Sequence, residues 1–171
     1  MKDYIKSSEE VVVSSSSLEK LNNQNIEYLV SKAKETQSNK FRLCCHETIN
    51  DPVHEMFIVH PKDVYIRPHK HIKKAESILV LEGCMDYITF KDSGEIKERV
   101  LLGDYNSGNQ FYIANKEYSF HSLIIYSDWC VFLEITKGPF IKDETCFAPW
   151  SAESKDKKGI KNFMKKYVRQ F

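Results

Sequence analysis

Two histidines and a glutamate stand close together near the middle of the chain, as His69-Lys70-His71 followed by Glu76. The surrounding residues favour β-strand, and residues i and i+2 of a strand point to the same face of a sheet. His69 and His71 can therefore aim at one point, and Glu76 can return to it from the next strand. Imidazole and carboxylate ligands suit a divalent transition metal that also holds a substrate. The spacing therefore predicts a metal site.

Two further observations extend this metal-site hypothesis. Glu76 opens the apolar run 76–83, which is typical of a buried strand, and an unpaired carboxylate is costly there. A fourth ligand is expected from a distant strand, and His121, in the apolar run 118–125, is the best candidate. The alternative is that His121 is a hydrogen-bonded core residue, which is the commoner role of a lone histidine in such a run.

Side chains that could bind or process a substrate precede the two histidines. If one strand runs unbroken from residue 63 to residue 71, Tyr65 and Arg67 share a face with His69 and His71. Arg67 could then bind a substrate carboxylate or phosphate in bidentate fashion, or form an ion pair at the rim of the domain. The phenol of Tyr65 could move a proton.

An earlier predicted strand offers a second pair of candidates. Arg42 and His46 share one face of it, so Arg42 could orient an anionic group and His46 could move a proton, or both could be structural. His54 and His60 flank the following strand close to turns, and we expect both to be solvated. Glu134 lies in an apolar run, where it could support a ligand imidazole or form a buried pair with an arginine.

Short strands are expected between the two ends of the chain, because apolar runs alternate there with turn-like breaks. A hairpin is indicated at Asp92-Ser93-Gly94. Several short strands at regular spacing are typical of a β-sandwich or a small barrel. The predicted strands are 41–46, 54–60, 63–69, 76–82, 84–91, 95–102, 110–114, 117–126 and 129–136.

The two ends of the chain differ from this β region, which we place at 41–150. The polar segment 1–17 is expected to be a mobile end, and 18–40 is expected to be a helical region. Residues 151–171 are expected to form a basic amphipathic helix with seven Lys or Arg against two Asp or Glu. Its apolar stripe is predicted to pack on the β region or on a second subunit, with an anionic membrane surface as the alternative. The stripe consists of Ile160, Phe163, Met164, Tyr167, Val168 and Phe171.

Composition restricts the class of protein. A length of 171 residues fits one domain, and 42% hydrophobic residues with 10 Phe and 9 Tyr indicate a folded globule. A net charge of +1 gives no electrostatic case for nucleic-acid binding. No apolar run has the length of a signal peptide or a membrane span. The five cysteines are odd in number and lack CxxC spacing, which favours reduced thiols and a cytoplasmic protein.

The residues of the metal-site hypothesis also carry a resemblance to a known superfamily. His69, His71, Glu76 and Gly83 have the spacing of the first motif of the cupins, and His121 corresponds to the histidine of the second. The second motif is degraded, since the usual Pro and Gly before His121 are missing. The departure concerns the local turn geometry more than the set of ligands.

A closer resemblance covers roughly residues 25–152. The order of motifs is similar to that of the WbuC-family cupin-fold metalloproteins, which are found among bacterial surface-polysaccharide (O-antigen) genes. The motifs are Arg42…His46, Tyr65…Pro68-His69-Lys70-His71, Glu76, Gly83, a hairpin with Gly94, His121, Glu134…Gly138-Pro139-Phe140 and Phe147-Ala148-Pro149-Trp150. The resemblance implies an all-β fold, a single cupin double-stranded β-helix (a jelly-roll-like barrel), with a helix at each end.

The same resemblance implies one divalent transition metal held by three His and one Glu, and it leaves Fe, Mn, Ni, Co and Zn open. Two classes of function remain. The first is a metal-dependent enzyme, an isomerase, epimerase or oxygenase, on a small polar molecule such as a sugar or nucleotide-sugar. The second is a non-catalytic module that binds the metal or a small ligand, or regulates. Open sheet edges favour a homodimer.

Overall fold

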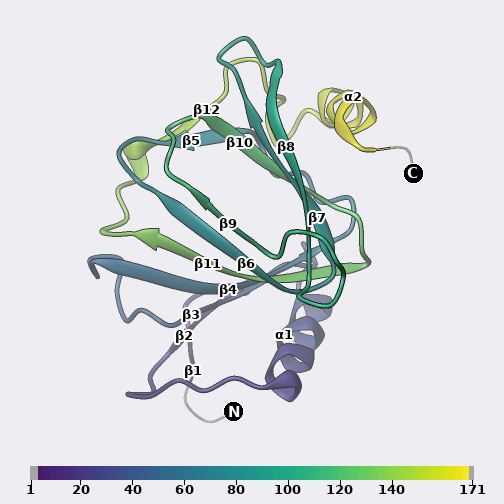
Figure 1. Cartoon of the computed structure of the whole chain (residues 1–171). Helices are drawn as coiled ribbons and strands as arrows, with labels where there is room; N and C mark the ends of the chain where they lie inside the picture. Colours follow the sequence, from purple (N-terminus) through teal and green to yellow (C-terminus); the bar gives the residue numbers. More distant parts are fainter. Residues whose placement is uncertain (1–3, 170–171) are drawn as a thin grey trace.

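The protein is built from two β-sheets that face each other, with one helix on the outer side of each (Figure 1). The computed structural model describes residues 4–169. The seven-stranded sheet has the order β1-β2-β3-β4-β11-β6-β9, and the five-stranded sheet has the order β12-β5-β10-β7-β8. Among the described residues neither sheet closes on itself, so the expected single barrel is not confirmed.

The strands of the larger sheet are β1 (Tyr4–Lys6), β2 (Val11–Ser14), β3 (Phe41–Cys44), β4 (Val53–Pro61), β6 (Glu76–Glu82), β9 (Tyr112–Asn115) and β11 (Trp129–Lys137). Those of the smaller sheet are β5 (His69–His71), β7 (Cys84–Phe90), β8 (Ile96–Gly103), β10 (Phe120–Ile125) and β12 (Thr145–Phe147). The pairs of neighbouring strands are antiparallel except β2 and β3, which are parallel. The helices are α1 (Asn23–Glu35), α2 (Lys157–Tyr167) and a 3-10 turn, η1 (Lys142–Glu144).

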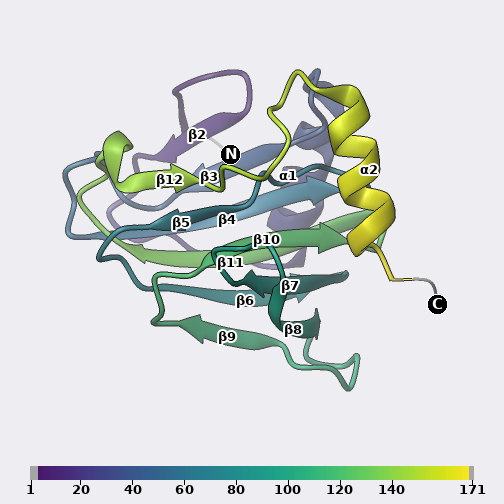
Figure 2. The ribbon, with the colours of Figure 1, turned by 90° about the horizontal axis from the view of Figure 1, so that it is seen from above.

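Alternation of side chains along the strands creates three apolar layers. The inner layer lies between the sheets and includes Ile58 of β4 and Leu123 of β10. Outside the larger sheet, Leu29 of α1 packs in one cluster with Val59 and Val131. Outside the smaller sheet, Phe163 and Tyr167 of α2 pack against residues that include Phe90 of β7. Figure 2 shows α2 beside the smaller sheet and α1 at the far side of the larger one.

The helix ends follow from their capping residues. Asn22 caps α1 and forms a reciprocal capping box with Asn25, and Thr36 is the C-cap at the other end. Asp156 caps α2, which is shorter than the predicted range. The apolar stripe of α2 packs on the β-sandwich of its own chain, while Phe171 lies outside the described residues. Within residues 4–169, no helix is long and apolar enough to cross a membrane.

Two parts of the strand prediction are wrong. Residues 64–68 form no ladder, because Asp63 adopts a left-handed turn (φ 62°) and Pro68 has no N–H to donate. The segment 1–17 was given no strand, yet it contains β1 and β2, and β2 pairs with β3. The flanking serines concealed the strand propensity of Val11 to Val13 in the sequence. The mobility of this segment, like the division of the chain at 18–40, 41–150 and 151–171, stays a prediction.

A buried carboxylate fastens the end of the chain to the smaller sheet. Asp86 of β7 is fully buried and accepts hydrogen bonds from Nε of Arg169, at 3.0 and 2.9 Å. The hydroxyl of Tyr126 donates to the same carboxylate at 2.5 Å, and a guanidinium nitrogen of Arg99 lies 3.5 Å away. Arg99 also donates to the carbonyl of Tyr167, the last residue of α2. This network holds α2 in place.

The substitution Asp86→Asn is expected to destabilise the fold by about 1–3 kcal/mol, because the buried position loses the negative charge that accepts hydrogen bonds from Tyr126 and Arg169. Urea unfolding measures this loss. Asp92→Asn is the matched control, since the side chain of Asp92 is 87% exposed and its pair with Lys70 is weak. Equal unfolding midpoints for the two variants would contradict the role of Asp86.

Candidate metal centre

One cavity between the sheets contains the chemistry that the sequence predicted. Its volume is about 1220 Å³. All four expected metal ligands line it, and so do Arg42, His46, Tyr65 and Arg67. All six histidines of the chain contribute to its wall: His46, His54, His60, His69, His71 and His121.

Three of these histidines converge. His69 and His71 lie on β5, two residues apart, so their side chains share the inner face. His121 lies on β10 and is the direct cross-strand partner of His69. One ring nitrogen of each histidine lies within 4.8 Å of the others, which is close enough for all three to bind one ion. The structure thus brings His121 to the predicted pair.

The outer ring nitrogens of the three histidines are held by the protein. Nδ1 of His69 lies 2.8 Å from the carbonyl oxygen of Arg67, and Nδ1 of His121 lies 3.2 Å from that of Ser119. A carbonyl only accepts, so in both rings Nδ1 carries the proton and Nε2 keeps a lone pair for a metal. Nδ1 of His71 lies 3.1 Å from the Thr145 hydroxyl. Such contacts are typical of histidines that bind metals.

The carboxylate of Glu76 approaches the same point from the larger sheet. Glu76 is 5% exposed, and its oxygens lie 3.1 Å from Nε2 of His121 and 3.8 Å from Nε2 of His71. Burial is the largest single effect on Glu76 and raises its pKa, but the neighbouring imidazoles, His121 foremost, and the hydrogen bond from Tyr87 together outweigh it and lower the pKa. Three imidazole nitrogens and an ionised carboxylate fit a divalent transition metal.

A tyrosine that no pattern in the sequence distinguishes supports this group. The hydroxyl of Tyr87 donates to Glu76 at 2.6 Å and accepts from the side-chain amide of Asn115 at 2.8 Å. Its ring lies 5.5 Å from that of His121 and nearly parallel to it. Tyr87 and Glu76 belong to different sheets, so no spacing in the sequence could have revealed the contact.

Burial keeps the imidazoles of His69 and His71 neutral. It lowers the pKa of His69 to about 4 and lowers the pKa of His71, in both cases as the largest cause. Neutral imidazole is the form that binds a metal, so these ligands need not lose a proton at neutral pH.

The other three histidines form no part of this cluster. His54 is 5% exposed and its ring stacks on that of His46, with centroids 4.0 Å apart. The Nδ1 atom of His60 is buried without a hydrogen-bond partner among the described residues, and burial lowers its pKa to about 3. The expectation that His54 and His60 are solvated is therefore wrong, because β4 turns both side chains into the cavity.

Tyr65 and Arg67 are held by contacts outside the histidine cluster. Because the chain leaves the sheet at residues 64–68, Ile66 packs in the inner core, while Tyr65 packs in the outer cluster with Phe163 of α2. The phenol donates to the carbonyl of Ala152 at 2.9 Å. Arg67 is held by Ser151 at 3.0 Å and by the ring of Phe147. The roles of Tyr65 and Arg67 in chemistry stay predictions that these contacts do not favour.

Arg42 and Glu134 line the cavity and stay apart. Neither side chain makes a hydrogen bond or an ion pair with any residue in the described part of the chain, so the expected buried pair is not formed. Burial and the nearby charge of Glu76 raise the pKa of Glu134 to about 7, while Arg42 opposes this rise.

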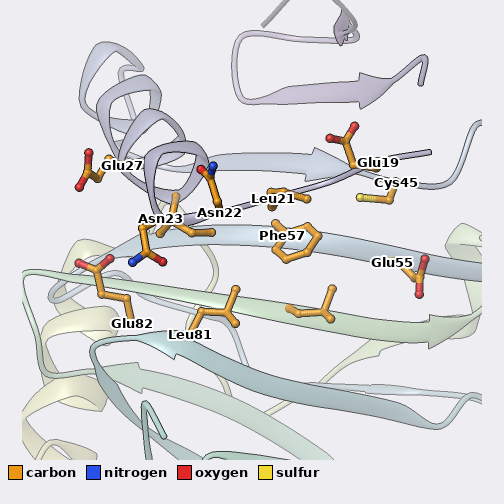
Figure 3. Close-up of a pocket in the computed structure, with 12 residues that line it drawn as sticks. Glu19, Leu21, Asn22, Asn23, Glu27, Cys45, Glu55, Phe57, Leu81 and Glu82 are labelled. Atoms are coloured by element: carbon orange, nitrogen blue, oxygen red, sulfur yellow. The ribbon is translucent and has the colours of Figure 1, made fainter. Parts of the chain in front are cut away.

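A second hollow, of about 690 Å³, lies on the opposite face of the larger sheet, below the start of α1 (Figure 3). Its rim carries Glu19, Glu27, Glu55 and Glu82, and its floor is apolar. It contains no histidine and none of the predicted site residues, so the candidate chemistry belongs to the cavity between the sheets.

One family model matches part of the chain. This model, described as a domain of unknown function (DUF6016), matches residues 21–102, slightly less than half of the chain. The match includes His69, His71 and Glu76 and ends before His121. No curated protein matches the chain.

Solved structures give the architecture. A protein from Shewanella oneidensis aligns over 75% of this chain and 85% of its own, with 10% identity and a TM-score of 0.53. A conserved protein with a double-stranded β-helix domain from Klebsiella pneumoniae aligns over 68% and 88%, with 12% identity and a TM-score of 0.50. A cupin superfamily protein from Desulfitobacterium hafniense aligns over 64% and 86%, with 11% identity and a TM-score of 0.47. The likeness shows a double-stranded β-helix and extends to the fold alone.

Removal of one clustered imidazole is expected to abolish metal binding. Elemental analysis of purified wild-type protein should give one metal per chain, and His121→Ala should give none. Tyr87→Phe should retain the metal with about 10–100-fold weaker affinity, because Glu76 loses its hydrogen-bond donor. His46→Ala is the control, since its ring lines the same cavity outside the cluster. Equal metal content in His121→Ala and the control would refute the site.

The metal-free protein is expected to lose stability as the pH falls from about 6.5 towards 4. In that window the unfolded chain binds protons on His60 and His69, whereas the folded protein, with pKa values of about 3 and 4, does not. Acidification therefore favours unfolding, by up to about 1.4 kcal/mol per pH unit for each such histidine. Urea titrations should show a shallower pH dependence for His60→Gln. An unchanged slope would contradict the burial of a neutral His60.

Proposed function

We propose that this protein is a mononuclear metal-dependent enzyme that acts on a sugar or nucleotide-sugar in bacterial surface-polysaccharide assembly. The observation that carries the proposal is the convergence of three imidazoles and one carboxylate on the wall of a cavity of about 1220 Å³. A cavity of this size admits a small polar molecule beside the metal ligands. The motif order that resembles the WbuC family supports the choice of pathway.

His69, His71, Glu76 and His121 would hold one ion of Fe, Mn, Ni, Co or Zn. When bound, such an ion acts as a Lewis acid or lowers the pKa of a bound water. Tyr87 holds the carboxylate of Glu76 in position by its hydrogen bond of 2.6 Å. The surrounding apolar core excludes water from the back of this group.

Other side chains of the cavity would bind and process the substrate. The guanidinium of Arg42 has no partner among residues 4–169 and would bind an anionic group. Burial lowers the pKa of His46, so its imidazole is neutral at physiological pH and can accept a proton. Arg67 and Tyr65 line the same cavity and would act from its rim. Isomerisation, epimerisation and oxygen chemistry are the candidate reactions.

A cytoplasmic location and a homodimer belong to the same proposal. All five cysteines are free, which suits a reducing compartment. Strand β9 ends one sheet and β8 ends the other, and such edges offer unpaired backbone groups to a second copy.

The test combines two measurements on the metal-loaded protein. Proton relaxation of water around bound Mn(II) should reveal an exchangeable water, which leaves a position for substrate. NMR in D₂O with nucleotide-sugars and sugar phosphates should then detect exchange of a carbon-bound proton, and an oxygen electrode should detect oxygen uptake. His69→Ala should abolish either activity. Absence of an exchangeable water would favour the alternative, a non-catalytic module in which the metal is saturated by protein ligands.

A further inference from the structure

Besides Glu76, the cavity is lined by the acidic residues Glu47, Asp143 and Glu134. Glu47 and Asp143 are exposed, whereas Glu134 is half-buried and takes no part in the metal-site chemistry. It lies on β11, where its cross-strand neighbours are Met56 of β4 and Ile78 of β6. Both are buried hydrophobic residues. Thr136, two residues further along β11, is the cross-strand neighbour of Glu76. Glu134 and Thr136 face the same side of the sheet, so the Cα atom of Glu134 lies about 7 Å along the strand from the position that pairs with Glu76.

The carboxylate of Glu134 is unsatisfied by the protein. Within residues 4–169 it has no hydrogen bond and no ion pair, in contrast to Glu76, which has Tyr87 and His121. A carboxylate placed among apolar side chains costs free energy unless something pairs with it. The fold therefore maintains an uncompensated acceptor on the floor of a cavity that already contains a candidate metal centre.

Arg42 supplies the opposite chemistry on the same floor. Arg42 of β3 pairs with Ile58 of β4, and Ile58 pairs with Phe132 of β11. Phe132 precedes Glu134 by two residues. The guanidinium of Arg42 also lacks a partner among the described residues. Arg42 and Glu134 are two strands apart across the sheet and two residues apart along it, which places their Cα atoms roughly 10 Å or more from each other. The guanidinium favours the ionised form of Glu134 only at a distance, without a direct contact among residues 4–169, so both groups are free to share a ligand.

We propose that Glu134 and Arg42 form a second binding subsite for a polyhydroxylated anion, a sugar that carries one carboxylate or phosphate. The guanidinium of Arg42 pairs with the anionic group, and Glu134 accepts hydrogen bonds from sugar hydroxyls. The inference rests on the proposed function in so far as the metal centre acts on another part of the same molecule. Because Arg42 brings a single positive charge, a ligand with a single anionic group is expected.

Calorimetry tests the subsite with four probes: D-gluconate, D-glucose 6-phosphate, neutral D-sorbitol and inorganic phosphate. Each is titrated into zinc-loaded wild-type protein and into His69→Ala, which lacks a metal ligand. The two sugar anions should bind with dissociation constants of about 1 mM or below, at least about tenfold tighter than sorbitol or phosphate. The preference should persist in His69→Ala, so binding at the subsite is measured separately from binding at the metal.

Three variants assign the roles. Arg42→Gln should erase the preference for anions over sorbitol. Glu134→Leu should weaken binding of both sugar anions at least about tenfold and leave inorganic phosphate unchanged. Because the unpaired carboxylate costs free energy in its apolar setting, Glu134→Leu should also raise the unfolding temperature. Glu55→Gln is the control, since Glu55 lies on β4 and lines the hollow on the opposite face of the sheet.

The outcomes are distinct. Unchanged affinity of the sugar anions in Glu134→Leu and Arg42→Gln overturns the subsite, and so does a lowered unfolding temperature of Glu134→Leu, because a structural pairing would then be lost. Loss of all binding in His69→Ala alone leaves the metal-dependent function standing and refutes the subsite. Retained, variant-sensitive binding in a protein that takes up no metal refutes the proposed function and supports the subsite.

Discussion

The burial of the Glu76 carboxylate between two sheets is the constraint on which the candidate site depends. A carboxylate that is 5% exposed must be paired, and in this protein its neighbours are His121, His71 and the hydroxyl of Tyr87. These partners come from the smaller sheet, whereas Glu76 belongs to the larger one. The electrostatic need of one side chain therefore ties the two sheets together at the candidate metal centre.

The two helices make this arrangement stable without entering it. Each covers the outer face of one sheet, so the inner faces are free to combine an apolar core with a polar cavity. The buried network of Asp86, Arg99 and Arg169 fastens α2 outside the very sheet that carries His69 and His121. The basic charge of the C-terminal segment thus has a structural use in Arg169, while its apolar stripe is occupied by packing within the chain.

The cavity has two chemical halves. One half carries the imidazoles whose pKa values are lowered by burial, which is the state that binds a metal. The other half carries Glu134 and Arg42, which have no partner among the described residues. A fold that keeps the half-buried carboxylate of Glu134 unpaired accepts a loss of stability there, and this pattern is common where a ligand completes the interactions. The halves are joined by β11, through the step from Thr136 to Glu134.

The sequence alone determined what is local. It determined that His69 and His71 share a face, that Glu76 returns on the next strand, and where the helices and most strands lie, because strand periodicity and capping depend on near neighbours. Only the tertiary structure decided that His121 stands opposite His69, that Tyr87 holds Glu76, and that His54 and His60 turn into the cavity. It also decided that the Tyr65 ring packs in the outer cluster and reaches only the rim of the cavity, since the break at residues 64–68 interrupts the alternation that an unbroken strand would keep. Pairing between distant strands and the interruption of a strand depend on contacts between remote residues, and local patterns carry no record of them.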